Sequence, residues 1–376
     1  LSVPNFEGNE RAYVTDAVVS EWVSTGGSKV GEFEAVFADY VGMPRAVACN
    51  SGTSAIHLML LAAGVGPGDE VIVPSYTFWA TVVPILSARG VPVFCEVDPE
   101  TFTLDPADIE RRITPRTKAI MVVHVWGCPA DMDAIMAIAK KHNLKVIEDC
   151  SHAHGATYKG KKVGTIGDAG CFSMQDTKLL CAGEGGVFVT NDRDVYERAV
   201  AYGHYERIRE LPPDSPYSKY TLTGMAYKYR VHPLGIAVAN VELDRLDERN
   251  EIRDSQGKRL EDEVAKLGFI RPQKVPEGAR RVYAYHYVRY DASKLGGLSL
   301  NTLLKAVSAE GVLCGTCGYG RLHYAPIFVE GGPYHDCGPA VPDLRLPVTE
   351  ALGEDTFMMA PRFENICPEL VNQYIE

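Results

Sequence analysis

The segment CFSMQDTKLLCAGEGG, residues 171–186, places a single lysine, Lys178, among residues that are mostly apolar, small or uncharged. Burial in such surroundings favours the neutral form of a lysine amine. A neutral amine can condense with a carbonyl carbon to form a Schiff base. The glycines that follow let the chain pass close to a bound molecule without side-chain obstruction. The segment therefore fits a covalent catalytic lysine, although a lysine that extends from a strand end into solvent would share this local sequence.

A second stretch, ACNSGTSAIHL, carries Ser51, Gly52 and Thr53 between a β-rich run and a helical pattern. The backbone N–H groups at the start of a helix have no intrahelical acceptors, and beside a hydroxyl they form a cradle for a phosphate. Serine and threonine also cap helices that bind nothing. Both interpretations stand on this stretch alone.

The third stretch, KVIEDCSHAHGA, ends a buried apolar run with Asp149. In open α/β sheets, ligands bind at the carboxyl ends of the strands. An acid at that point can cap a turn, bind a metal, or pair with a cationic ring nitrogen. His152, three residues further on, could flank the same ligand.

Taken together, these residues have one common use, which is to bind pyridoxal 5'-phosphate. The cradle and Ser173 would hold the phosphate, and Phe78, which follows another strand, would stack on the ring. Asp149 would keep the ring nitrogen protonated, so that the ring can accept electrons. Lys178 would hold the cofactor as a Schiff base and, once displaced by a substrate amine, would move a proton between the α-carbon and the cofactor's aldehyde carbon.

Alternating strands and helices must position these residues. Near-continuous apolar runs predict strands buried on both faces of a mainly parallel sheet, at 70–78, 91–98, 118–127, 144–149, 169–175 and 185–192. Helices are predicted at 53–64 and 129–143, the latter with acidic residues early and basic residues late. The fold class is therefore α/β, with a large domain over residues 1–240 that includes an N-terminal arm. A polar helix at 241–268 opens a smaller α+β domain, which spans residues 241–376.

The composition limits the partners and the compartment. A net charge of -11 argues against nucleic acid or an anionic membrane as the main partner. No apolar run approaches the ~20 residues that cross a bilayer. Cys314 and Cys317 form a C-x-x-C without a second pair at zinc spacing, so no metal site is predicted. The ten scattered cysteines fit a reduced, cytoplasmic setting.

The motifs SGTSAIHL, GDEVIVPSYTFWAT, EDCSHAHGA, YKGKKVGTIGD, CFSMQDTK and AGEGG occur in the order seen in the sugar aminotransferases of the DegT/StrS family. The chain resembles that family from residue 1 to its end, most densely from 50 to 190. The resemblance implies the fold of the type-I pyridoxal-phosphate enzymes, with a large domain around a mostly parallel sheet and a small C-terminal domain. It also implies a homodimer with two shared active sites.

The resemblance assigns the cofactor contacts one by one. It implies that Gly52, Thr53 and Ser173 contact the phosphate, that Phe78 stacks on the ring, and that Asp149 meets the ring nitrogen.

By the same resemblance, His152 lies near the ring hydroxyl and Lys178 is the Schiff-base lysine. A branch of the family that removes sugar hydroxyls has histidine at the last position, so lysine favours transamination. The chain departs from the family at AYKYR, where Lys228 stands in place of an asparagine that reaches the phosphate across the dimer. A lysine could serve the same phosphate as a point charge.

Similar enzymes move an amino group from glutamate or glutamine to the ketone of a nucleotide-linked keto sugar or a keto cyclitol. These small molecules are the predicted partners. Cationic and aromatic residues gather in probable loops, which makes Arg230 a predicted substrate contact, although a solvated loop with ordinary ion pairs would share these residues. The resemblance makes His323 a second predicted contact, because the family often has a histidine in a comparable C-terminal loop. His124 is a weaker candidate, since it could equally be a hydrogen-bonded core histidine.

The sequence leaves two rival functions to consider beside this one. The first is a regulatory or sensory protein that keeps the cofactor but turns over little. The second is a dinucleotide oxidoreductase, which lacks support because no G-x-G-x-x-G follows a strand with an acid about 20 residues on.

Overall fold

The computed structural model describes residues 4–21, 23–24, 28–330, 343–360, 363 and 365–376. The helices are α1 (Glu10–Val19), α2 (Ser28–Val41), α3 (Gly52–Ala62), α4 (Trp79–Ser87), α5 (Pro106–Arg112), α6 (Met132–His142), α7 (Arg193–Gly203), α8 (Pro233–Asp244), α9 (Leu246–Ala265), α10 (Leu300–Ala309), α11 (Pro326–Val329), α12 (Pro347–Asp355) and α13 (Pro368–Ile375). Short 3-10 helices lie at η1 (Val125–Gly127), η2 (Tyr205–Glu210), η3 (Ser218–Tyr220), η4 (Ala292–Leu295) and η5 (Leu322–Tyr324). The strands are β1 (Ala46–Cys49), β2 (Glu70–Pro74), β3 (Val91–Cys95), β4 (Thr117–Val123), β5 (Lys145–Asp149), β6 (Thr157–Tyr158), β7 (Lys161–Lys162), β8 (Ala169–Ser173), β9 (Gly186–Val189), β10 (Ile270–Pro272), β11 (Ala279–Arg280), β12 (Tyr287–Tyr290), β13 (Gly315–Thr316) and β14 (Thr356–Met358).

A seven-stranded sheet forms the centre of the molecule, in the order β1-β9-β8-β5-β4-β2-β3. Strands β3, β2, β4, β5 and β8 pair in parallel, whereas β9 is antiparallel to both β1 and β8. Consequently β1 runs in the same direction as the parallel strands. The predicted mainly parallel sheet is confirmed, and so is the α/β class.

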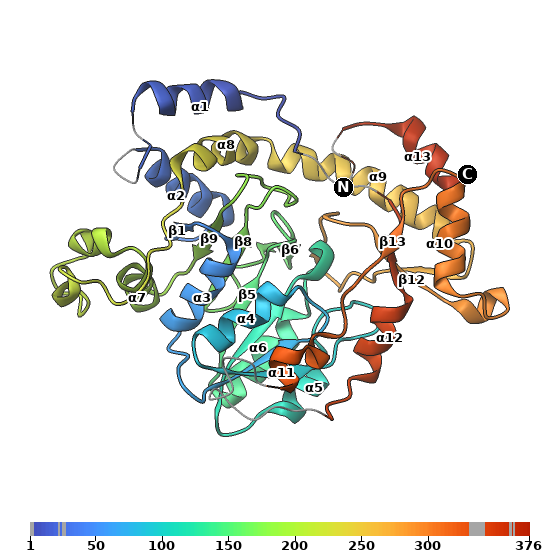
Figure 1. Ribbon diagram of the computed structural model, residues 1–376, viewed down its shortest axis with the longest axis horizontal. Coiled ribbons are helices and arrows are strands. Elements are labelled where there is room, and N and C mark those ends of the chain that lie inside the picture. Colours follow the sequence, from blue (N-terminus) through green and yellow to red (C-terminus); the bar gives the residue numbers. More distant parts are fainter. Residues whose placement is uncertain (1–3, 22, 25–27, 331–342, 361–362, 364) are drawn as a thin grey trace.

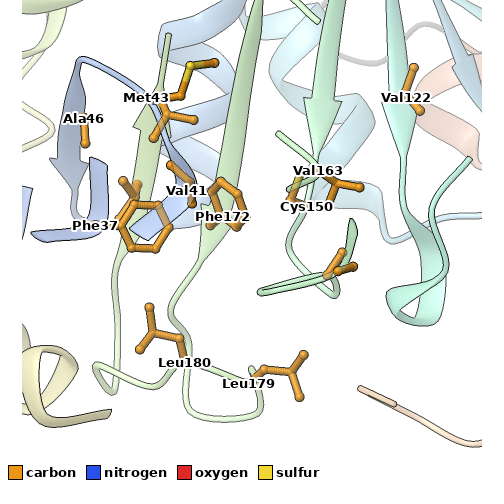
Figure 2. Packing of buried hydrophobic residues seen from close by; sticks show 14 of the residues in the cluster. Phe37, Val41, Met43, Ala46, Val122, Cys150, Val163, Phe172, Leu179 and Leu180 are labelled. Carbon is orange, nitrogen blue, oxygen red and sulfur yellow. The ribbon is translucent and has the colours of Figure 1, made fainter. Parts of the chain in front are cut away.

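The sheet is buried on both faces because alternate residues of its strands enter two different apolar clusters. Ile72 and Val122 belong to the cluster that also contains residues of α2, α6 and α8. Val73 and Met121 belong to the cluster that contains residues of α3, α4 and α7. Figure 2 shows part of the first cluster, where Phe172 of β8 lies beside Phe37 of α2. This two-sided burial explains why the strand sequences are almost continuously apolar.

The two helices predicted in this region are present at α3 and α6. Ser51 caps α3, and Asp131 caps α6 through a hydrogen bond from the backbone N–H of Ala134. The α6 helix ends at Asn143, which adopts the left-handed conformation that stops many helices. The polar segment predicted as one helix at 241–268 is instead two helices, α8 and α9, which meet at Arg245.

The C-terminal elements gather on one side of the molecule, where α10, α12 and α13 lie around β12 and β13 (Figure 1). A four-stranded sheet, β10-β12-β14-β13, has its own apolar cluster with contributions from α9 and α13. The C-terminal part also pairs with the segment between β5 and β8, because β11 is antiparallel to β6. The predicted domain boundary at residue 241 falls within α8 and stays a prediction.

Candidate active site

A cavity of about 430 Å³ opens at the carboxyl ends of the parallel strands. Seven of the ten predicted site residues line it, which are Lys178, Gly52, Thr53, Phe78, Asp149, His152 and Ser173. They come from the segments that follow β1, β2, β5 and β8. The sheet therefore brings together residues that are up to 126 positions apart in the chain, counted from Gly52 to Lys178.

The turn into α3 combines a helix cap with a close approach to β8. The hydroxyl of Ser51 accepts a hydrogen bond from the backbone N–H of Ser54 at 3.1 Å, so this serine is indeed an N-cap. Gly52 lies against Ser173, since a Cβ on Gly52 would stand 2.7 Å from Ser173 Cβ and 3.1 Å from its Oγ. A Cβ on Gly186 would stand 2.4 Å from the carbonyl oxygen of Ser51. Glycine at these two positions lets a hydroxyl approach a helix N-terminus, an arrangement that fits a phosphate.

Asp149 presents a buried carboxylate to the cavity. Only 3% of the residue is exposed. Thr81 Oγ1 donates to Oδ2 at 2.8 Å, and the backbone N–H of Ser151 donates to Oδ1 at 3.0 Å. Among the described residues, no cationic side chain forms an ion pair with this carboxylate. A buried anion without a cation is costly, so the site fits a ligand that brings a positive charge, such as a protonated ring nitrogen.

His152 is held in one tautomer by its neighbour Trp126. The backbone N–H of Trp126 donates to Nδ1 of His152 at 3.4 Å, and the two rings stack at 5.2 Å with 7° between their planes. Burial, followed by the charge of Lys178, holds the pKa of His152 well below its ordinary value. The imidazole is therefore neutral, and its remaining proton lies on Nε2.

Trp126 adopts a left-handed backbone conformation, with φ 58° and ψ 16°. This conformation is strained for a bulky residue, and such strain concentrates at functional sites. The next residue, Gly127, is tied to the C-terminal part of the chain, because its carbonyl accepts from the backbone N–H of Val282 at 3.0 Å. A Cβ on Gly127 would stand 1.9 Å from the carbonyl oxygen of Val282. The close approach of these two segments thus determines where His152 is held.

Lys178 is half-buried and follows a tight turn, in which its backbone N–H donates to the carbonyl of Gln175 at 2.9 Å. The next two residues, Leu179 and Leu180, are buried in the core below the β8 strand (Figure 2). Tyr285 also holds the turn, since its hydroxyl donates to Thr177 Oγ1 at 3.3 Å. These contacts fix the backbone of Lys178 at the edge of the cavity.

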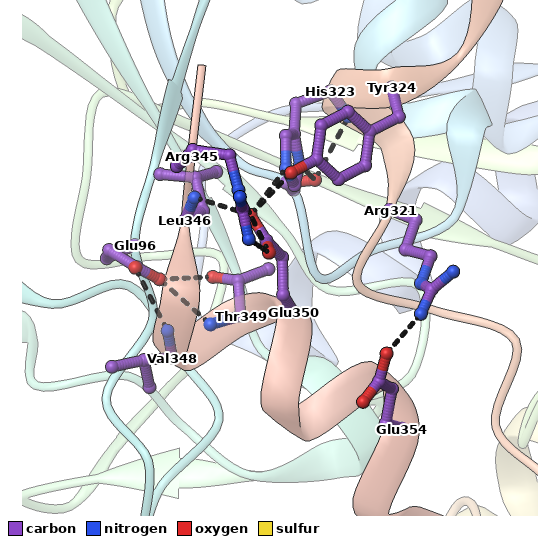
Figure 3. Close-up of polar contacts among 11 residues, drawn as sticks. Glu96, Arg321, His323, Tyr324, Arg345, Leu346, Val348, Thr349, Glu350 and Glu354 are labelled. Atoms are coloured by element: carbon purple, nitrogen blue, oxygen red, sulfur yellow. Dashed lines mark hydrogen bonds and ion pairs between the residues drawn. The ribbon is translucent and has the colours of Figure 1, made fainter. Parts of the chain in front are cut away.

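The other three predicted residues do not line this cavity. His323 is 2% exposed and lies near Glu350 (Figure 3), and its Nδ1 forms a hydrogen bond of 2.7 Å with the hydroxyl of Ser75. Its Nε2 lies 3.5 Å from Glu350 Oε1, and burial lowers the pKa of His323. In this structure His323 joins the C-terminal segment to the end of β2, and its contact with a substrate stays a prediction.

Lys228 and Arg230 lie on the segment that leads into α8. Lys228 forms an isolated backbone bridge with His204, and Arg230 pairs with Glu206 at 2.5 Å. Arg230 also lines a separate cavity of about 180 Å³, together with His204. Neither residue is among those that line the cavity of its own chain, and the predicted roles of Lys228 and Arg230 stay predictions.

Several lining residues were not singled out from the sequence. Thr81 stands three residues after Phe78 in the motif GDEVIVPSYTFWAT, and this closeness to a predicted cofactor contact was the available signal. Tyr285 and Tyr319 come from the C-terminal part of the chain, more than 100 positions beyond Lys178. No local pattern marks them, because their place depends on how that part packs against the large sheet.

One buried cluster has the donor atoms of a metal site, but these atoms already take part in hydrogen bonds. His124, Glu148 and Cys150 have ligand atoms within 4.8 Å of one another. The carboxylate of Glu148 already accepts from the backbone N–H groups of Gly164, Ile166 and Gly167, at 2.7, 2.7 and 2.6 Å. His124 Nε2 lies 3.0 Å from the same carboxylate, and its Nδ1 accepts from Ala130. His124 is thus a hydrogen-bonded core histidine, one of its two predicted interpretations.

No helix within the described ranges has the length and apolarity that a bilayer crossing requires.

Comparisons with known proteins agree with this geometry. The model of the DegT/DnrJ/EryC1/StrS aminotransferase family matches residues 4–376. The GDP-perosamine synthase of Caulobacter vibrioides is 42% identical over 268 residues, which cover 71% of this chain and 70% of that protein. The L-glutamine:2-deoxy-scyllo-inosose aminotransferase of Streptomyces fradiae is 39% identical over 282 residues, which cover 74% of this chain and 66% of that protein.

Among solved structures, the X-ray structure of the aminotransferase from Psychrobacter cryohalolentis is similar with a TM-score of 0.90 at 30% identity. The likeness covers 100% of this chain and 96% of that chain. These matches confirm the resemblance drawn from the sequence motifs.

Proposed function

Because this chain belongs to the DegT/DnrJ/EryC1/StrS aminotransferase family, whose members depend on pyridoxal 5'-phosphate, we propose that it transfers an amino group from glutamate or glutamine to the ketone of a sugar or cyclitol. The names of its relatives support this substrate class, since one makes GDP-perosamine and another aminates 2-deoxy-scyllo-inosose with L-glutamine. The observation that carries the proposal is the cavity itself, which is lined both by Lys178 and by the buried Asp149, a carboxylate without an ion-pair partner among the described residues.

When bound, the cofactor supplies an aldehyde and an electron-accepting ring, which together carry the amino group between two substrates. Gly52, Thr53 and Ser173 would bind its phosphate through the helix N-terminus and the serine hydroxyl. Phe78, which is partly exposed at the cavity, would cover one face of the ring. These contacts would orient the cofactor before any substrate enters.

The remaining residues would manage protons. Asp149 would hold the proton on the ring nitrogen, and His152 would donate its Nε2 proton to the ring hydroxyl. Lys178 would attach the cofactor through Nζ and, once released by the substrate amine, would move a proton at the substrate's α-carbon. Asp149 and His152 are both buried at the wall of the cavity.

We further propose a homodimer with shared active sites. Lys178 is the one lysine or arginine among the described residues that line the cavity, and a doubly charged phosphate calls for a second cation. Lys228 of one protomer would supply it to the other, and Arg230 would meet the substrate there. The nearby loop carries Leu222, which is 98% exposed, as expected of a segment that a second chain covers. The described cysteines are all free thiols, which supports the predicted cytoplasmic setting.

The test begins with the cofactor. Borohydride reduction of the yellow protein, followed by peptide mass spectrometry, should place the label on Lys178, and Lys178→Ala should carry none. A label on another lysine, or an active Lys178→Ala variant, would overturn the assignment of the catalytic lysine.

The second step separates the enzyme from a regulatory protein of the same fold. Excess glutamine or glutamate should convert the bound cofactor to its amine form, and a panel of keto sugars and keto cyclitols should be screened for return of the aldehyde absorbance. A protein whose cofactor no amino donor converts would instead support the regulatory alternative.

A further inference from the structure

Two threonine hydroxyls form a hydrogen-bonded chain that ends on the carboxylate of Asp149. Thr81 Oγ1 donates to Asp149 Oδ2 at 2.8 Å, and Thr77 Oγ1 lies 3.0 Å from Thr81 Oγ1. Both threonines are buried, and both line the cavity. They are four residues apart, with Thr77 directly before the N-cap residue Phe78 and Thr81 in the first turn of α4, so the entry into one helix positions both hydroxyls.

The direction of this chain follows from counting protons. An ionised carboxylate has acceptors only, so the single hydroxyl proton of Thr81 must point to Asp149. Thr81 Oγ1 then has only lone pairs to offer Thr77, and Thr77 must be the donor. Each hydrogen bond polarises the next, and Thr77 therefore strengthens the donor that Thr81 presents.

From this geometry we propose that Thr81, supported by Thr77, is a positioning residue that keeps Asp149 charged and correctly rotated opposite the cofactor's ring nitrogen. The inference rests on the proposed function, because it assumes that the ring binds there. Thr81 holds one carboxylate oxygen and the backbone N–H of Ser151 holds the other, so the plane of the carboxylate is fixed before the cofactor arrives.

The electrostatic consequence concerns where one proton rests. A carboxylate and a pyridine nitrogen in contact share a proton, and hydrogen bonds donated to the carboxylate favour its charged form. With Thr81 in place, the proton stays on the ring nitrogen, where it lets the ring accept electrons. Without that donor, the buried carboxylate takes the proton more readily, and the ring becomes a weaker electron acceptor.

The variants Thr81→Val, Thr81→Ser and Thr77→Val separate this role from packing. Valine keeps the shape of threonine without its hydroxyl, serine keeps the hydroxyl, and Thr77→Val leaves the contact with Asp149 intact. Each protein is loaded with cofactor that carries ¹⁵N in the ring, and the nitrogen chemical shift reports whether the ring nitrogen is protonated. Loss of one hydrogen bond to a charged group should change the proton-sharing equilibrium by roughly ten- to a hundredfold.

We expect the ring nitrogen of Thr81→Val to shift toward the unprotonated value, Thr77→Val to shift less in the same direction, and Thr81→Ser to match the parent protein. The rate of the amino-donor half-reaction should fall in the same order, with little change in donor affinity. If Thr81→Val does not retain the cofactor, the shift of Thr77→Val decides. A parent-like nitrogen shift in the deciding variant would overturn the inference, whereas failure of the parent protein to bind the cofactor at Lys178 would overturn the proposed function itself.

Discussion

Replacing Gly52 by alanine tests whether the turn into α3 holds the cofactor's phosphate. The new Cβ would stand 2.7 Å from Ser173 Cβ and 3.1 Å from Ser173 Cα. Unstrained carbon–carbon contacts lie at about 3.5–4.0 Å, so Ser173 or the helix N-terminus must move by roughly 1 Å. Ser173 has little room to yield, because it is paired in the sheet with Gly186, which itself lies against Ser51.

This displacement can be translated into a loss of cofactor affinity. A hydrogen bond to a charged group contributes about 1.5–3 kcal/mol. Loss of one such contact to the phosphate, at 1.4 kcal/mol for each tenfold change, weakens binding by about 10- to 150-fold. We therefore expect Gly52→Ala to fold but to bind pyridoxal phosphate with a dissociation constant raised by that factor.

The assay is a titration of the apo-protein with pyridoxal phosphate, followed by absorbance and protein fluorescence. Gly31→Ala in α2 is the matched control, since no described atom lies within 4 Å of its added Cβ apart from its chain neighbours and the backbone of its own helix. Neither glycine has a positive φ, so the backbone accepts alanine at both positions. An affinity in Gly52→Ala equal to that of the Gly31→Ala control would refute the phosphate cradle.

Three further predictions concern stability, each measured by urea unfolding. Burial lowers the pKa of His286 to about 3, whereas the pKa of a histidine in an unfolded chain is about 6.5. Because the unfolded state binds more protons between these two pKa values, the free energy of unfolding falls as the pH drops through this window. His286→Leu should remove about 1.4 kcal/mol per pH unit of that dependence between pH 6 and 5, and an unchanged slope would contradict the burial of a neutral ring. Glu96 accepts hydrogen bonds from backbone N–H groups in the first turn of α12 (Figure 3), so Glu96→Ala should lower the free energy of unfolding by about 1–3 kcal/mol. Glu354→Ala breaks only an exposed ion pair and should lower it by under about 1 kcal/mol, so equal losses in the two variants would contradict this reasoning. Leu180→Ala should cost about 2–5 kcal/mol because Leu180 is fully buried beside the turn that carries Lys178, and a cost near zero would show that this turn is not anchored in the core.

Much of the candidate site was predictable because its residues follow strands directly. Asp149 ends β5, and Ser173 ends β8, so the convergence of parallel strands at one edge of a sheet brings them together. Gly52 begins the helix after β1 for the same reason. In each case the signal is local, since an apolar run followed by a polar or small residue is visible in a few consecutive positions.

The less predictable features depend on contacts between distant segments. The helix break at Arg245 has no proline or glycine near it, since residues 236–256 contain neither, so no local signal marks it. His323 is a predicted substrate contact from the family resemblance, and its contacts with Ser75 and Glu350 in this structure have no local signal in the sequence. The tautomer of His152 depends on the backbone of Trp126, whose strained conformation is imposed by packing against the C-terminal part of the chain.

The amino-acid sequence by itself predicted the alternation of strands and helices around the large sheet, the type of cofactor and Lys178 as the candidate to bind it, because each of these predictions follows from short patterns of residues with a definite chemistry. Only the tertiary structure decided which side chains surround that chemistry. Segments far apart in the chain pack together to give Asp149 its partners, to place the aromatic residues around the cavity and to bury His323. Because the hydrophobic effect is not directional, the sequence of one segment does not show which other segment it packs against.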